Sequence, residues 1–145
     1  MAEPSGAKKA GPCDLFKMSE IETIFGALDG EPETQPNKQF GGTECTIIAK
    51  HGLINLVQLT GGTSKMNEMV AILKKQGAPV VPISGYGDQG FMAVAKADPK
   101  APGVLGAIIF SKGNKVFALS VLGDIPEATL SENLKTMAAI AAKGM

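Results

Sequence analysis

Residues 104–122, with the sequence VLGAIIFSKGNKVFALSVL, decide the fold of this chain. Two runs that are rich in apolar and β-branched residues flank the polar residues 111–114, which is the pattern of a β-hairpin with a short, glycine-containing loop. Apolar residues occupy both alternating sets of positions in each run, so neither strand has a wholly polar side. Such strands lie in the middle of a sheet that is covered on both faces. We therefore expect a central hairpin in which Ile109 and Phe117 are buried.

The remaining segments predict the elements around this hairpin. Strands are expected at residues 43–50, 53–60, 80–83 and 91–96, and helices at about residues 19–28, 64–76 and 127–143. The strand at residues 80–83 carries Pro82 and is expected at a sheet edge. Because consecutive strands follow one another through short turns, the sheet should be mainly antiparallel. The fold class is therefore α+β, with a sheet of about five to six strands on which an N-terminal, a middle and a C-terminal helix pack.

Three features describe the N-terminal third of the chain. Ser19 and Glu22 have the spacing of a capping box, in which each side chain bonds the backbone N–H of the other residue, and this predicts the start of the first helix. Residues 29–42 hold several glycines and prolines and are expected to form a long loop, a kind of segment that is functional or mobile. Residues 1–12 have nothing to bury, so we expect a flexible lead before a single domain at residues 13–145.

The composition limits the classes of function. The chain has 145 residues, with 14 basic and 14 acidic ones, and every basic residue is lysine. No positive field therefore favours nucleic acid, and no guanidinium group can grip a phosphate. The single histidine, His51, is expected at an exposed hairpin tip, without a cluster of other metal ligands or a nucleophile to activate. We expect no metal, no cofactor, no catalytic residue and, because no apolar run is long enough, no membrane span.

Cys13 and Cys45 bear on the compartment of the protein. A disulfide between them would close a loop of roughly 30 residues and tie the N-terminal helix to the sheet. Two buried free thiols are the alternative, and the residues by themselves leave both readings open. Neither cysteine lies in a CxxC motif and no histidine lies near Cys13, so a redox or nucleophilic role is not expected.

Residues 85–90, with the sequence GYGDQG, form the strongest candidate site. Their spacing matches the GxGxxG motif of dinucleotide-binding proteins, but that motif needs a helix after it, and residues 91–96 predict a strand. The glycines leave the backbone open to close approach, and the other side chains supply an aromatic ring and polar groups. We expect the site where this loop meets residues 29–42; the alternative is a tight turn in which Asp88 bonds nearby backbone N–H groups. The candidate contact residues for a ligand or partner are Gly85, Tyr86, Gly87, Asp88 and Gln89.

Several short motifs, taken in order, resemble a known family. They are CDLF at residues 13–16, the helix with Ser19 and Glu22 that ends near Phe25 and Gly26, Cys45 with Thr46, GYGDQGF at residues 85–91, and KGNKV at residues 112–116. They resemble small bacterial cell-envelope lipoproteins of uncharacterised domain families, well represented in actinobacteria, whose fold is similar to the PsbP-type α-β-α sandwich. The resemblance implies a disulfide between Cys13 and Cys45 and an extracytoplasmic location. The chain departs from the family at Ile47, where an aromatic residue is common, and at the N-terminus, which has no lipid-anchoring cysteine.

These observations predict a non-enzymatic domain of the periplasm or cell envelope that binds a protein partner or a small ligand. The signal segment would belong to a precursor, because residues 1–12 do not have the apolar core of one, and that precursor could carry a lipid anchor. Two alternatives remain, an enzyme of an unrecognised type and a cytosolic interaction module. The state of the cysteines separates the cytosolic reading from the first one.

Overall fold

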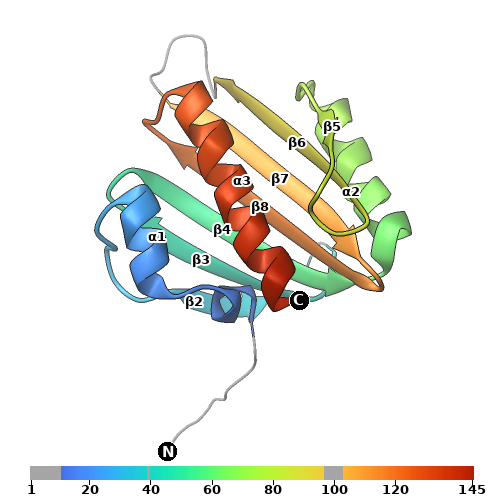
Figure 1. Cartoon of the computed structure of the whole chain (residues 1–145), viewed down its shortest axis with the longest axis horizontal. Coiled ribbons are helices and arrows are strands. Elements are labelled where there is room, and N and C mark those ends of the chain that lie inside the picture. The colour runs from blue at the N-terminus through green and yellow to red at the C-terminus, as the bar shows by residue number, and fades with distance from the viewer. Residues whose placement is uncertain (1–10, 39, 97–102) are drawn as a thin grey trace, which may run out of the picture.

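The computed structural model describes residues 11–38, 40–96 and 103–145, and Figure 1 shows how they are arranged. The elements, in chain order, are η1 (Pro12–Leu15), α1 (Met18–Phe25), β2 (Glu33–Pro36), β3 (Thr43–Ala49), β4 (Gly52–Thr60), α2 (Gly62–Lys75), β5 (Val81–Ile83), β6 (Gln89–Lys96), β7 (Val104–Lys112), β8 (Lys115–Gly123) and α3 (Glu127–Gly144). Residues 98–103 contain two prolines and a glycine, which predict a loop, and apart from Gly103 they lie outside the described residues. So does most of the expected lead, although Gly11 and Pro12 at its end are buried.

The strands of the described chain form one antiparallel sheet in the order β2-β3-β4-β8-β7-β6-β5, which confirms the α+β fold. The sheet has seven strands rather than five to six, because part of the expected 29–42 loop pairs with β3 as β2. Every side chain of β2 is exposed, so this strand has no alternation of apolar and polar residues from which it could be recognised. The opposite edge is β5, in agreement with the position of Pro82.

The hairpin of β7 and β8 lies in the middle of the sheet, and helices pack on both faces (Figure 1). Phe110 and Phe117 belong to the larger core cluster, on the face that carries η1, α1 and α3. Ile109 and Val116 belong to a second cluster, on the face that carries α2. Ile109 is 3% exposed and Phe117 is 0% exposed, which confirms the central position predicted for the hairpin.

The turn of this hairpin is tighter than the expected residues 111–114. Lys112 pairs with Lys115, so only two residues connect the strands. Ser111 is a strand residue that is fully buried, and its Oγ lies 3.0 Å from Thr63 Oγ1 at the start of α2. A polar residue that the sequence assigned to the turn therefore helps to join β7 to α2.

The first helix begins and ends earlier than expected, since α1 starts at Met18 and its last residue is Phe25. The expected capping box of Ser19 and Glu22 is wrong. The Lys17 N–H donates to Glu20 Oε1 at 2.9 Å, because the N-cap is Lys17, two positions before Ser19, and the third helical residue is therefore Glu20 and not Glu22. The other two helices begin and end within two residues of the expected positions.

Helix α3 lies across the face of the sheet over β7 (Figure 1). Leu130 and Leu134 are fully buried on its sheet-facing side, as the helical spacing predicts. A Cβ atom at Gly106 of β7 would come within 2.9 Å of both leucine side chains, so this position must be glycine for the helix to pack this closely. No helix among the described residues combines the length and the apolar character that crossing a membrane requires.

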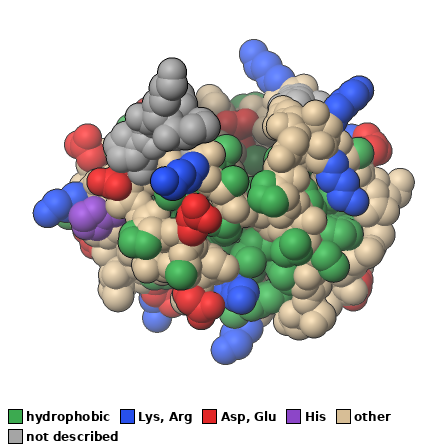
Figure 2. All heavy atoms as spheres, turned by 90° about the horizontal axis from the view of Figure 1, so that it is seen from above, with side chains coloured by type: hydrophobic (Ala, Val, Ile, Leu, Met, Phe, Trp, Pro, Cys, Tyr) green, Lys and Arg blue, Asp and Glu red, His purple; other side chains and the backbone are tan. Residues whose placement is uncertain are grey.

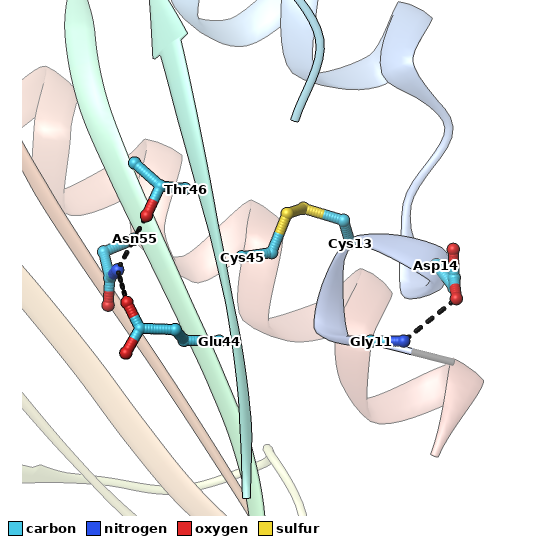
Figure 3. The surroundings of a disulfide bond; sticks show 7 residues. All are labelled: Gly11, Cys13, Asp14, Glu44, Cys45, Thr46 and Asn55. Atoms are coloured by element: carbon cyan, nitrogen blue, oxygen red, sulfur yellow. Dashed lines mark hydrogen bonds between the residues drawn. A yellow bond between two sulfur atoms is a disulfide. The ribbon is translucent and has the colours of Figure 1, made fainter. Parts of the chain in front are cut away.

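A disulfide joins Cys13 of η1 to Cys45 of β3, with a Cα–Cα distance of 5.9 Å. Figure 3 shows Cys45 pointing towards η1, whereas its neighbours Glu44 and Thr46 point to the other side of β3. Next to the disulfide, the Gly11 N–H donates to Asp14 Oδ2 at 3.0 Å, and this bond caps the N-terminal end of η1 (Figure 3). The pairing implied by the family resemblance is therefore confirmed, and it fixes the N-terminal segment on the sheet.

Candidate functional site

Residues 85–88 form a turn that is held by the central hairpin. The Asp88 N–H donates to the Ser111 carbonyl oxygen at 2.7 Å, and the Asp88 carboxylate accepts from the Gly113 N–H, also at 2.7 Å. Gly87 has a φ of 78°, and a Cβ atom there would collide with the Ser111 carbonyl oxygen. The ring of Tyr86 is half-buried and packs against the larger core cluster. Asp88 and Gly87 thus have structural contacts of the kind that the turn alternative predicts.

The other candidate residues of this segment are exposed. Gly85 lies in the turn, and Gln89 begins β6, where it pairs with Ser111. A contact between any of the five candidate residues and a ligand or partner stays a prediction.

The two loops that were expected to meet lie in different parts of the sheet. Residues 33–36 form β2 at one edge, whereas residues 85–88 lead into β6, next to the other edge. Phe40 packs against the cluster beneath α2, and Tyr86 packs against the cluster on the opposite face. The expected meeting point is therefore wrong, because the order of the strands, which the sequence does not reveal, separates the loops.

Replacement of Asp88 by alanine is expected to lower the free energy of unfolding by about 1 kcal/mol, because the Gly113 N–H loses a charged acceptor near the surface. Urea unfolding of the purified variant measures this loss. Glu31→Ala, which removes an exposed carboxylate outside the helices and strands, serves as the control and should change stability by less than about 0.5 kcal/mol. Equal stability of the two variants would contradict the structural role of Asp88.

A cavity of about 250 Å³, which we call the first cavity, lies between the C-terminal half of α2 and the sheet. Strands β4, β8 and β7 form its floor, α2 covers it, and Phe40 lies at its side. Most of its lining is apolar, with Leu73 of α2 above Ala107 and Ala118 of the sheet. The pattern of a mainly apolar concavity with a few polar groups is typical of small-molecule sites.

The volumes of the sheet residues explain the cavity. The N-terminal half of α2 packs through Met66 against large side chains such as Val116. Beneath its C-terminal half, the neighbouring positions of β7 and β8 on this face carry the small residues Ala107, Ala118 and Ser120. Since the helix rests on the large residues, these small ones cannot fill the space below its second half.

Polar groups stand at one side of the first cavity, where Glu44 orients two amides. Its Oε1 accepts from Asn37 Nδ2 at 2.8 Å, and its Oε2 accepts from Asn55 Nδ2 at 3.3 Å. Asn55 Nδ2 also donates to Thr46 Oγ1 at 3.2 Å (Figure 3). Because both donor contacts of Asn55 are on its nitrogen, the oxygen of this amide is turned away from Glu44 and can accept a hydrogen bond.

A second cavity, of about 230 Å³, adjoins the first. The two share Leu73, Gln76 and Ala107, and the second extends over β6, where Ala93 and Ala95 line it. Lys96 lies at its end.

The groups that line the first cavity suit binding better than catalysis. They are amides, one hydroxyl and apolar side chains, and none of these changes its charge near neutral pH. Ser120 lies in the lining, but His51 lies in the turn between β3 and β4, so these two residues do not form a nucleophile–base pair. Within residues 11–38, 40–96 and 103–145, no group of three His, Cys, Asp or Glu side chains could hold a metal ion.

Sequence patterns did not point to these cavities. The signal present in the chain is a small residue at alternate positions of the central hairpin, Ala107 before Ile109 and Ala118 before Ser120. Only the register shows that Ala107 lies directly beside Ser120 and Ala93, so that the small side chains form one row under α2.

No family model and no curated protein matches the sequence. The structure is similar to the crystal structure of the extracellular domain of PknH from Mycobacterium tuberculosis, with a TM-score of 0.51 and 10% sequence identity over 93% of this chain and 95% of that chain. At this identity the likeness shows a shared fold alone. The resemblance to cell-envelope lipoproteins and to the PsbP-type sandwich stays a prediction.

Proposed function

We propose that this chain is a non-enzymatic, extracytoplasmic domain that binds a small, uncharged and largely apolar ligand in the first cavity. The observation that carries the proposal is the cavity itself, with apolar walls and the oriented amide of Asn55 at one side. An apolar ligand would gain from leaving water, and the amide oxygen would fix its orientation through one hydrogen bond.

Three observations support the extracytoplasmic location. Disulfides such as Cys13–Cys45 persist in oxidising compartments and are rare in the cytosol. The protein with the similar fold is an extracellular domain. The motifs at residues 13–16 and 85–91 resemble cell-envelope lipoproteins.

Binding of the neutral fluorescent probe N-phenyl-1-naphthylamine tests the ligand site. We expect the unmodified protein to bind it and Ala118→Leu to weaken this binding at least tenfold, because the added side chain fills the first cavity. Ser120→Leu fills the same space from the next position on that face and should have the same effect.

The matched control is Ala139→Leu, which adds the same atoms at an exposed position of α3 on the other face of the sheet. It should bind the probe as the unmodified protein does. The melting temperature of each variant shows whether the domain is still folded. If both filled variants remain folded and bind the probe unchanged, the first cavity is not the site.

A further inference from the structure

The two cavities form a single elongated recess beneath the end of α2. Each by itself is smaller than the range of roughly 300–1,000 Å³ that is typical of small-molecule sites, whereas together they fall inside it. The side chains of Leu73 and Gln76 lie where the cavities meet, above Ala107. Gln76 is exposed and lies just after the helix, so its side chain can turn aside towards water.

One cross-strand row of the sheet runs along the floor of the recess. From β4 through β8 and β7 to β6, the paired residues of this row are Asn55, Ser120, Ala107 and Ala93. The first two line the first cavity, Ala107 lines both, and Ala93 lines the second. Three strand spacings correspond to about 14 Å. A compact ligand would fill only one end of this space, whereas a chain-like molecule would fill it all.

The polarity of the recess changes along this row. At the β4 end, Asn55 can accept a hydrogen bond through its amide oxygen, and the Ser120 hydroxyl can donate or accept one. At the β6 end, Ala93, Ala95 and Leu105 line the recess with apolar side chains. The recess therefore suits a molecule with a hydrogen-bonding group at one end and an apolar chain at the other.

The polar end of the recess disfavours a charged group. None of the described residues that line the first cavity is charged. The nearby carboxylate of Glu44 lies behind the amides of Asn37 and Asn55, which donate to it at 2.8 and 3.3 Å. An anion at this end would be repelled by Glu44, and a cation could not contact it directly. A head group of either charge would thus leave water without a partner, at a large cost in free energy.

Apolar surface borders the recess. The next cross-strand row, two positions along the same strands and hence on the same face, consists of Leu53, Leu122 and Leu105. Their side chains are between 42% and 48% exposed. Since Leu105 also lines the second cavity, an apolar chain can enter the recess over this row without crossing polar surface.

Hydrophobic side chains are also exposed elsewhere. On the surface seen in Figure 2 they gather in the right-hand half, the side on which Figure 1 places α2, β5 and β6. Val81 of β5 is 48% exposed and pairs with Met92, which packs against the larger core cluster on the face opposite α2. Binding to such surface does not depend on residues beneath α2, so replacements beneath α2 identify a ligand in the recess.

We propose that the joined cavities bind one uncharged amphiphile with a hydroxyl head group, as in a long-chain alcohol. This inference rests on the proposed function and names the class of its ligand. The hydroxyl donates to the amide oxygen of Asn55 and accepts from Ser120, and the apolar chain lies beneath α2 and reaches Ala93. An extended chain advances about 1.2 Å per bond, so the row matches a chain of about ten to twelve atoms.

Displacement of N-phenyl-1-naphthylamine by 1-hexanol, 1-octanol and 1-decanol tests the position of the chain. Affinity should rise by about fourfold for each methylene that enters the recess. Ala93→Leu and Ala95→Leu, which fill the second cavity from neighbouring positions of β6, should remove most of this rise. Both should leave the binding of the probe and of 1-hexanol within about twofold. Ala139→Leu, the exposed control on α3, should preserve the rise.

The head group is tested by comparing ligands of equal size. Methyl nonyl ether, an isomer of 1-decanol that has no O–H to donate, should bind about fivefold more weakly. Asn55→Ala should remove this difference, whereas Asn67→Ala, at an exposed position of α2, should preserve it. Decanoate should bind at least tenfold more weakly than 1-decanol, because its charge would leave water beside Glu44.

The outcomes separate this inference from the proposed function. Suppose that probe binding depends on Ala118, but that the folded Ala93→Leu and Ala95→Leu variants keep the full rise with chain length, or that the ether or decanoate binds as tightly as 1-decanol. The inference is then wrong and the ligand site stands. If neither Ala118→Leu nor Ser120→Leu weakens probe binding in a folded protein, the proposed function fails, and this inference fails with it.

Discussion

Replacement of Phe117 by alanine is expected to lower the free energy of unfolding by about 3–5 kcal/mol. The side chain is fully buried in the central strand of the sheet. Its ring centroid lies 5.4 Å from that of Phe110 and 6.1 Å from that of Phe16, so it joins the hairpin to the N-terminal segment. Truncation removes this apolar burial and leaves a cavity that the two neighbouring rings cannot fill.

Unfolding in urea measures this loss. The free energy of unfolding should fall with urea concentration at the same slope for the unmodified protein and for Phe117→Ala. Leu122→Ala is the matched control, because Leu122 lies on the same strand but is 42% exposed. Its loss should stay below about 1 kcal/mol. A loss of that small size for Phe117→Ala as well would mean that the central strand does not carry the core.

Removal of the disulfide by the double replacement Cys13→Ala and Cys45→Ala is expected to lower the free energy of unfolding by about 3–4 kcal/mol. The bond links residues that are 32 positions apart, and in the chain-entropy model a loop of this length restricts the unfolded state by that amount. The effect also has a native-state part, because the bond holds η1 and Phe16 against the sheet.

Two measurements check this result. A reducing agent should destabilise the unmodified protein to the level of the double variant and should leave the variant itself unchanged. Thiol titration of the unfolded, unreduced protein should find no free thiol. Two free thiols in protein from an oxidising compartment would contradict the bond in solution and would favour the cytosolic alternative.

The central hairpin and the buried sides of the helices could be predicted because their patterns are local. The two apolar runs around Gly113 and Asn114 specify a buried hairpin whatever the rest of the chain does. Leu130 and Leu134 follow the period of a helix that buries one side. The strand β2 was missed because an exposed edge strand has no alternation of apolar and polar residues. The capping box was misplaced because Ser19 and Glu20 are both residue types that occur in the first turn of a helix.

For the candidate site, the sequence and the structure point to different residues. The sequence pointed to residues 85–90 because glycines and an aromatic residue are common at contact sites. In the structure, the Asp88 carboxylate accepts a hydrogen bond from the backbone N–H of Gly113. This residue lies in the turn of the central hairpin, 25 residues further along the chain. The cavities under α2 depend on residues of four strands and one helix, none of which is distinctive by itself.

The sequence alone determined the α+β class, the buried hairpin and the expectation that few side chains are suited to catalysis or metal binding. Apolar periodicity and composition, on which these conclusions rest, are properties of the chain itself. Only the tertiary structure decided the strand order, and with it the separation of residues 29–42 from residues 85–90. It also decided the register that sets Ala93, Ala107 and Ser120 side by side beneath α2. The physical reason is that a cavity arises from the mismatch of side-chain volumes across a packed interface, and that interface does not exist until the sheet and the helix have come together.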